Sequence, residues 1–462
     1  MRSRLWLLAL VAAFAMAALP AAAQEAAPAG PVSFIRDVAP VLVQNCLACH
    51  GPLDAKGAHQ VANYELLLRP GESGGASIVP GKPDESELYR LISETDKDLW
   101  MPKEGDRLAD EAIARVRLWI EQGATFDGRD PKAALASIIP EPPHPNPPET
   151  YRVPVPVTAL AFHPSGAELA VGGYHEITIW NPADGSLLRR ITNVAQRTYG
   201  LAYSPDGSLL AAASGTPGQL GDVKLYNSAD GSVVKDLGSM ADVAFDVAFS
   251  PDGTRLAACS ADRSIRIYDV AGGTEQVLIE DHADWVMAIA FNHDGTRLAS
   301  ASRDKTSKVF DTATGESLIT YPGHADSVFG VDWSLDGTQV LSSGRDRKIH
   351  VWNPADGAKI AEMAGFGHEV YKTLLVGNRV FACSADNTAR EFAADSKAQT
   401  RAYAGHTDWV FTLSFHEPTM KLATGSFDGE VRIWNVADGA GLVTFKAAPG
   451  FVPPAAAQAA AQ

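Results

Sequence analysis

The chain has 462 residues, a length that predicts two or three domains instead of one. Hydrophobic residues make up 46% of it and charged residues 20%, which is a globular composition and excludes a disordered or collagen-like chain. The formal net charge of −16, from 55 acidic and 39 basic residues, disfavours binding to nucleic acid or anionic lipid and favours a basic partner.

The first 23 residues have the pattern of a cleaved export signal. Arg2 and Arg4 precede an apolar stretch at 5–19, and alanines at 21–23 provide a small-residue cleavage site. The apolar stretch is short for a bilayer span, so cleavage is favoured over an uncleaved anchor. We therefore expect a Sec-type signal peptide at 1–23 and a periplasmic or otherwise exported protein with no membrane span after cleavage.

Residues 31–130 are predicted to form a small all-α domain. Ser33 can cap a helix over residues 34–43, and residues 108–122 predict a second helix that ends at Gly123. The apolar stripe of this second helix consists of Leu108, Ile113, Val116, Trp119 and Ile120. Prolines are frequent in the segment that follows, so residues 131–156 are predicted to be an extended, semi-rigid linker between two halves of the chain.

From residue 157 to 447 the sequence repeats with a period of about 42. Each repeat contains short alternating stretches that predict four strands. One aromatic residue per repeat ends such a stretch, at Trp180, Tyr226, Tyr268, Phe310, Trp352, Phe392 and Trp434. Seven units of four strands predict an all-β propeller with seven blades, so the fold class is multidomain. The Ala- and Gln-rich tail, 448–462, is expected to be disordered.

The repeats resemble the WD40 family over the whole of residues 157–447. The last unit carries the family pattern in full, in Gly405-His406, Ser426-Phe427-Asp428 and Trp434-Asn435. The first two units lack the Gly-His pair, and the second has an insertion at 214–222. The resemblance implies a buried structural network, not a catalytic one, made of His406, Ser426, Asp428 and Trp434.

Two pairs of loop residues in the propeller favour protein binding: Trp285 and Trp409, and Arg303 and Arg345. By the resemblance, these positions face one end of the ring, and exposed Trp and Arg are typical of protein interfaces. The alternative for the two tryptophans is packing between neighbouring blades. Cys259 and Cys383 fall in the third and sixth units, which are not neighbours, so both are predicted to be buried free thiols.

Cys46-Leu47-Ala48-Cys49-His50 is the motif that predicts chemistry. Cys46 and Cys49 are three residues apart, so one helical turn can present both thiols to the two vinyl groups of a haem, and His50 can then ligate the iron. A zinc site is an alternative, with His59 and acidic residues as further ligands, and a redox disulfide between the two cysteines is another. Neither alternative explains the His that directly follows, so the motif predicts one covalently bound haem c.

Met101 is the predicted second axial ligand of the iron. It is the one Met within residues 31–130, and it stands between Trp100 and Pro102. A thioether opposite a His stabilises ferrous iron and raises the reduction potential, which suits electron transfer. Two alternatives are a Met that only fills a gap in the core, and His59 as the ligand, which would give a bis-His iron of lower potential.

The surroundings of the motif resemble the Planctomycete-type cytochrome c domain, a relative of the class I c-type cytochromes. The resemblance spans nearly all of residues 31–130 and implies a small helical fold with His50 and Met101 as axial ligands. It rests on Phe34-x-x-Asp37-Val38-x-Pro40, Cys46-x-x-Cys49-His50-Gly51, Val79-Pro80-Gly81-x-Pro83-x-x-Ser86-x-Leu88, Met101-Pro102 and Trp119-Ile120-x-x-Gly123-Ala124.

The predicted function is one-electron transfer by an exported cytochrome whose propeller is a protein-docking scaffold, so the protein is expected to be an electron carrier with no catalytic residues. Residues 31–130 contain 17 acidic and 11 basic residues, a net charge of −6, which favours a redox partner with a basic patch. Two alternatives are an oxidoreductase with its active site in the propeller, and a haem sensor in which the Met101 side opens to a small gas.

Overall fold

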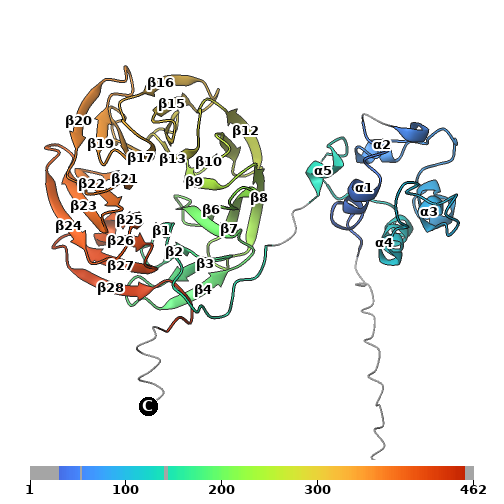
Figure 1. Cartoon of the computed structure of the whole chain (residues 1–462), viewed down its shortest axis with the longest axis horizontal. Helices are drawn as coiled ribbons and strands as arrows, with labels where there is room; N and C mark the ends of the chain where they lie inside the picture. Colours follow the sequence, from blue (N-terminus) through green and yellow to red (C-terminus); the bar gives the residue numbers. More distant parts are fainter. Residues whose placement is uncertain (1–30, 53–54, 129, 140–143, 453–462) are drawn as a thin grey trace, which may run out of the picture. The chain divides into compact units, whose positions relative to one another are not determined.

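A computed structural model of the chain describes residues 31–52, 55–128, 130–139 and 144–452. The predicted signal peptide and most of the predicted tail lie outside these ranges. The chain forms two compact units that divide between residues 142 and 143, a helical unit and a propeller of seven four-stranded sheets (Figure 1). This confirms the predicted fold class. No helix in the described ranges is both long and apolar enough to cross a lipid bilayer.

Short helices joined by loops form the N-terminal unit. They are η1 (Phe34–Val38), α1 (Ala39–Asn45), η2 (Lys56–Ala58), α2 (Tyr64–Leu67), η3 (Pro83–Glu85), α3 (Glu87–Ser93), α4 (Asp110–Glu121) and α5 (Leu135–Ile138). The helix expected over 34–43 is present as a π-helical turn, η1, followed by α1, and Ser33 caps it by accepting a hydrogen bond from the Arg36 amide at 3.2 Å. The helix expected over 108–122 is α4.

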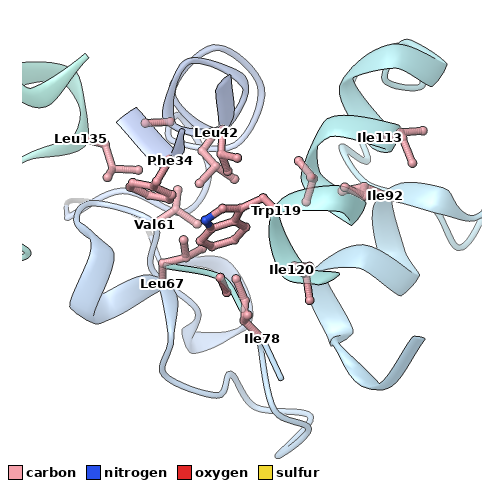
Figure 2. Close-up of a cluster of buried hydrophobic side chains, with 14 of the residues drawn as sticks. Phe34, Leu42, Val61, Leu67, Ile78, Ile92, Ile113, Trp119, Ile120 and Leu135 are labelled. Atoms are coloured by element: carbon pink, nitrogen blue, oxygen red, sulfur yellow. The ribbon is translucent and has the colours of Figure 1, made fainter. Parts of the chain in front are cut away.

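The apolar stripe of α4 lies at the centre of the helical core. All five of its predicted residues are buried, with at most 7% of their surface exposed. Figure 2 shows the Trp119 indole among apolar side chains from the surrounding helices and loops, and its ring centroid lies 5.2 Å from that of Phe34. The indole nitrogen of Trp119 donates to the Thr125 carbonyl at 3.0 Å, which satisfies its one polar atom. Gly123 ends the helix with φ of +100°, as the sequence predicts.

The segment expected to be a linker, 131–156, contributes side chains to both units. Leu135 of α5 is fully buried in the helical core, and Ile138 packs against the same cluster. Tyr151 and Val155 are buried against the propeller, together with Ala448 from the start of the predicted tail. The prolines of residues 131–156 favour an extended backbone, but the apolar side chains of this segment are nevertheless buried. The interval between α5 and the propeller is therefore shorter than the predicted linker.

Each propeller blade is an antiparallel sheet of four strands that are consecutive in the chain. Blades 1 to 4 contain β1 (Leu160–Phe162), β2 (Leu169–Gly172), β3 (Ile177–Trp180), β4 (Leu187–Ile191); β5 (Arg197–Tyr203), β6 (Leu209–Thr216), β7 (Leu220–Asn227), β8 (Val233–Met240); β9 (Ala244–Phe249), β10 (Arg255–Ser260), β11 (Ile265–Asp269), β12 (Thr274–Ile279); and β13 (Val286–Phe291), β14 (Arg297–Ser302), β15 (Ser307–Asp311), β16 (Ser317–Tyr321). Blades 5 to 7 contain β17 (Val328–Trp333), β18 (Val340–Gly344), β19 (Ile349–Trp352), β20 (Lys359–Met363); β21 (Val370–Val376), β22 (Arg379–Ser384), β23 (Thr388–Ala393), β24 (Gln399–Ala404); and β25 (Val410–His416), β26 (Lys421–Ser426), β27 (Glu430–Asn435), β28 (Gly441–Lys446), with the short helix η4 (Glu417–Thr419) after β25.

The blades pack face to face through apolar clusters that join each blade to the next. The seven predicted aromatic positions all lie on the third strands, as the sequence predicts. The second strands are buried on both faces, because a neighbouring blade covers each side. Cys259 of β10 and Cys383 of β22 are fully buried free thiols there, which confirms that prediction. The predicted insertion in blade 2 lengthens β6 and β7 to eight residues each.

Candidate functional site

The expected haem-attachment motif lies at the C-terminal end of α1. Cys46 ends this helix, and its amide donates to the Leu42 carbonyl at 2.9 Å. The amides of Cys49 and His50 both donate to the Cys46 carbonyl, at 3.2 and 2.9 Å. These bonds wind residues 46–50 into a helical turn, in which residues three apart share a face. A side chain at Gly51 would lie 2.6 Å from the Leu47 carbonyl oxygen, so the tight turn requires a glycine there.

A backbone carbonyl orients the His50 ring. The Nδ1 atom of His50 donates to the carbonyl oxygen of His59 at 3.2 Å. The His59 ring is held in the same way by the Arg69 carbonyl, also at 3.2 Å, and its centroid lies 5.7 Å from that of His50. Because the proton on Nδ1 is used in this bond, Nε2 of His50 is the nitrogen that can bind a metal.

The thiol chemistry disfavours a redox disulfide. Burial, together with the neighbouring Cys49, raises the pKa of Cys46 to about 11. A redox-active Cys-x-x-Cys pair needs the opposite shift, because the thiolate is the attacking species. Cys46 instead packs against the apolar core of the unit as a neutral thiol. Cys46 therefore lacks the lowered pKa that is typical of a redox-active pair.

Among the described residues, no set of zinc ligands surrounds the motif. Within the described ranges, groups of three or more His, Cys, Asp or Glu ligand atoms within 4.8 Å of one another occur in the propeller, and none of them includes Cys46, Cys49 or His50. A structural zinc ion needs four such atoms in a tetrahedron about 2.0 to 2.3 Å from the metal. The donor set of two thiols and one imidazole therefore fits haem c better than zinc.

Met101 packs against the same apolar core as Cys46. Its amide donates to the Leu91 carbonyl at 3.0 Å, which ties the Met101 loop to α3. The neighbouring indole nitrogen of Trp100 is buried and has no hydrogen-bond partner among the described residues. The Met101 thioether and the Cys46 thiol thus border one apolar core, and the unsatisfied buried donor of Trp100 is next to Met101 in the chain. These residues fit a haem c, with a polar edge for Trp100 to reach.

The propeller contains the expected His–Asp networks, but the hydroxyl that bonds to the blade 7 histidine is not that of the predicted serine. In blade 7, Trp434 Nε1 and His406 Nε2 both bond to the Thr424 hydroxyl, at 2.9 and 2.8 Å, and His406 Nδ1 lies 3.3 Å from Asp428. Ser426 lies where β26 enters a turn, and its hydroxyl donates to the Asp408 carbonyl at 3.0 Å and accepts from the Asp428 amide at 3.2 Å. The hydroxyl partner of His406 is thus Thr424, two residues before Ser426, one step of the strand alternation.

Blades 4 and 5 repeat this arrangement, with Ser300 and Ser342 as the hydroxyl partners of their histidines at 2.7 Å. Blade 5 adds a second histidine, His350, whose ring stacks on that of His324 with centroids 4.0 Å apart and planes 12° apart. Burial, with His324 beside it, lowers the pKa of His350. Both ring nitrogens of His324 are hydrogen-bonded, to Asp346 at 2.8 Å and to Ser342 at 2.7 Å, as expected for a structural network.

The four residues expected at a partner surface lie in loops of blades 4, 5 and 7. Trp285 and Trp409 are 37% and 46% exposed, and each also contacts a ring of the preceding blade. The Arg303 guanidinium lies 4.1 Å from the centroid of the Trp285 ring. Arg345 reaches the carboxylate of Glu369 in the next blade, at 3.5 Å. The two tryptophans thus pack between neighbouring blades and are also partly exposed to solvent, so the two alternatives for them occur together.

Phe427 is a further exposed aromatic residue on this surface, and the sequence analysis did not identify it. It is 44% exposed, and its ring centroid lies 6.1 Å from that of Trp409. It occupies the turn between the second and third strands of its blade, where blades 4 and 5 carry Arg303 and Arg345. Alignment of the repeats places Phe427 at the same position as Arg303 and Arg345, and this is the sequence signal that could have identified Phe427.

Known families match both units. A family model for Planctomycete cytochrome C matches residues 46–105, from the first cysteine of the motif to beyond Met101. A family model for the WD domain, G-beta repeat, matches residues 231–269, 273–311, 315–353 and 397–435. The chain joins a Planctomycete-type cytochrome c domain to a WD40 propeller. No curated protein matches the chain.

Each WD40 match begins at the outer strand of one blade and ends at the third strand of the next, as 231–269 does with β8 to β11. A cytochrome c domain implies haem c as its cofactor, so the two matches support a haem protein with a propeller scaffold. The cytochrome domain is consistent with an exported protein, and the propeller suggests interaction with other proteins.

Proposed function

We propose that the protein is an exported, one-haem c-type cytochrome that transfers single electrons, and that its WD40 propeller docks a partner protein. The observation that carries this proposal is the attachment motif at the end of α1, in which the His59 carbonyl holds His50 so that Nε2 is available for iron. When bound, haem c supplies an iron couple that accepts and releases one electron.

The residues of the motif have separate roles in this proposal. Cys46 and Cys49 would hold the haem through thioether bonds, and His50 and Met101 would ligate the iron. The bond from the Met101 amide to the Leu91 carbonyl ties the ligand loop to α3. The apolar core beside these residues excludes water, and a dry environment with a Met ligand favours a raised reduction potential.

The proposed docking surface consists of Trp285, Arg303, Arg345, Trp409 and Phe427. Its aromatic residues are rigid and partly exposed, and Arg303 and Arg345 add planar donors, which is a composition typical of binding hot spots. The acidic charge of the cytochrome domain favours a redox partner that carries a basic patch, because opposite charges speed the encounter.

A visible and near-infrared spectrum of the purified holoprotein tests the electron-transfer proposal. We expect the c-type absorption bands, a Met–iron charge-transfer band in the oxidised protein, and no binding of carbon monoxide by the reduced protein. Carbon monoxide binding would instead support a sensor, and absorption by a second cofactor would support an enzyme. Absence of covalent haem would contradict the proposal.

Substitution of the surface residues tests the docking proposal. The variant Trp285→Ala/Arg345→Ala should lose a protein that co-purifies with the wild type from the exporting cells. Leu318→Ala is a matched control, because Leu318 is 40% exposed but lies on the outer strand β16. Equal recovery of the partner with all three proteins would count against this surface.

A further inference from the structure

The boundary between blades 1 and 7 differs from the other six blade boundaries. Elsewhere the chain itself crosses the boundary, because the outer strand of one blade leads into the inner strand of the next. Blades 1 and 7 instead consist of β1–β4 and β25–β28, and within the described residues no strand from one end of the chain pairs with the blade at the other end. This boundary has an apolar cluster like the others, but no covalent connection.

The segment that leads into β1, residues 144–157, lies across this part of the ring, and we call it the entry segment. Its first residue contacts blades 1 and 2. The His144 amide donates to the Asn193 side chain at 3.0 Å, and His144 Nε2 lies 2.7 Å from an oxygen of Asp222 on β7. Further along, Arg190 of β4 donates to the carbonyls of residues 148 and 149.

The second half of the entry segment contacts both ends of the propeller chain. The Tyr151 amide donates to the Pro449 carbonyl, and the Val157 amide donates to the Ser426 carbonyl of blade 7, at 3.1 and 3.0 Å. A side chain on Gly429 would lie 2.7 Å from Pro154, so glycine permits the close approach. Figure 1 shows the teal entry segment and the red end of blade 7 meeting beside β3, β4 and β28.

Two buried carboxylates depend on the entry segment for one of their partners. Glu176 is fully buried, and its oxygens accept bonds from Arg190 of its own blade and from the Tyr151 hydroxyl, at 2.5 Å each. Asp222 is 1% exposed, and it accepts from Lys224 of its own strand at 2.8 Å and pairs with His144. Each blade thus supplies a cation and the entry segment supplies the second polar partner, without which a buried charge is poorly satisfied.

Blade 6 contains the same triad without the entry segment. Glu391 of β23 is 3% exposed, and it accepts bonds from Arg379 and from the Tyr403 hydroxyl, the latter at 2.9 Å. Both partners belong to its own blade, and the tyrosine comes from the outer strand β24. At blade 1 the tyrosine of the triad therefore comes from the entry segment, whereas in blade 6 it comes from the outer strand.

We propose that the entry segment is a closing strap of the propeller, which holds blade 1 against blade 7 through Tyr151 and its backbone contacts and is anchored to blade 2 through His144. A propeller whose ends are not joined can open at that boundary without breaking any other blade. The strap opposes this opening, because its release would expose the apolar cluster Tyr151–Val155–Ala448 and leave Glu176 and Asp222 with one partner fewer.

Hydrogen exchange on the full-length holoprotein tests this proposal, with Tyr151→Phe as the variant and Tyr403→Phe as the matched control. Each change removes one hydroxyl from the same kind of Glu–Arg–Tyr triad. Tyr151→Phe should speed exchange in β1 and β28 on the order of tenfold, which is the size expected for the loss of one buried hydrogen bond. Exchange in β21–β24 should stay unchanged. Tyr403→Phe should affect β22–β24 and leave β1 unchanged, and the haem spectrum should be the same in both variants.

Two results would overturn the strap: unchanged exchange in β1 and β28 of Tyr151→Phe, or an equal increase in all seven blades. Where Tyr151→Phe does not fold, His144→Asn replaces it. This variant removes the imidazole from Asp222 at the other end of the entry segment, and faster exchange confined to blades 1, 2 and 7 is then the supporting result.

Discussion

The Nδ1 atom of His50 lies 3.2 Å from the carbonyl oxygen of His59, nine residues further along the chain. A carbonyl oxygen can only accept, so this contact places the ring proton on Nδ1 and leaves Nε2 as the basic nitrogen. Burial, with His50 beside it, lowers the pKa of His59. The two histidines therefore have different parts: the backbone of His59 orients His50, and the ring of His50 is the proposed iron ligand.

Covalent attachment depends on the two thiols of the motif. The variant Cys46→Ala/Cys49→Ala should lose all haem that survives denaturation, because these two thiols make the proposed thioether bonds and iron ligation alone does not survive denaturation. A haem stain after denaturing electrophoresis measures this. Cys259→Ala/Cys383→Ala is the matched control, since these thiols are buried in the propeller, and it should stain like the wild type. Haem that stays bound to the first variant after denaturation would disprove thioether attachment.

The identity of the second axial ligand can be read from a pair of substitutions. Met101→Ala should abolish the Met–iron charge-transfer band and lower the midpoint potential on the order of 0.1 V, because a thioether ligand stabilises ferrous iron. His59→Ala should keep both, since its role is performed by a backbone carbonyl. Redox titration and near-infrared absorption are the measurements. If His59→Ala loses the native spectrum and Met101→Ala keeps it, the iron has bis-His ligation.

Two hydroxyls on β26 should differ in their contribution to stability. Thr424→Val removes a group that serves both His406 and Trp434, and it should lower the free energy of unfolding by about 2 to 3 kcal/mol. Ser426→Ala removes bonds to backbone groups only, to the Asp408 carbonyl and from the Asp428 amide, and should cost about 1 to 2 kcal/mol. Urea denaturation of both variants checks the order. A larger loss for Ser426→Ala would contradict the network described for blade 7.

Asp332 should make the propeller less stable as the pH rises. Its carboxylate accepts hydrogen bonds from the amides of Trp333 and Leu375, and burial raises its pKa from 3.8 to about 6. Because the folded pKa exceeds the unfolded one, the folded state holds a proton that the unfolded chain has lost between these values. The stabilising contribution is full below about pH 4 and is lost as the pH rises through 6.

The variant Asp332→Asn stays neutral, so its unfolding free energy relative to the wild type should rise by up to about 3 kcal/mol between pH 4 and 7. Urea denaturation at several pH values measures the difference. Asp336→Asn provides a control of opposite sign, because the Ser334 hydroxyl lowers the pKa of the exposed Asp336. A difference for Asp332→Asn that does not change with pH would contradict the raised pKa.

The features that the structure shares with the sequence-based expectations are those whose signal is local. The Cys-x-x-Cys-His spacing places two thiols and an imidazole on one turn, and α1 ends there. The stripe of α4 has the helical period, and its residues are all buried. The sequence does not tell which hydroxyl reaches His406, because strand alternation places Thr424 and Ser426 on the same face and only the turn after β26 decides between them.

The sequence by itself determined the attachment motif, the candidate ligand Met101 and the seven blades, because each depends on residue types repeated or spaced over short distances. The tertiary structure alone decided which groups meet across long distances: the His59 carbonyl behind His50, Phe427 beside Trp409, and Tyr151 on Glu176. Composition assigned Tyr151 to a linker, since prolines surround it. Its burial follows from the open boundary between the first and last blades, which only the closed ring brings together.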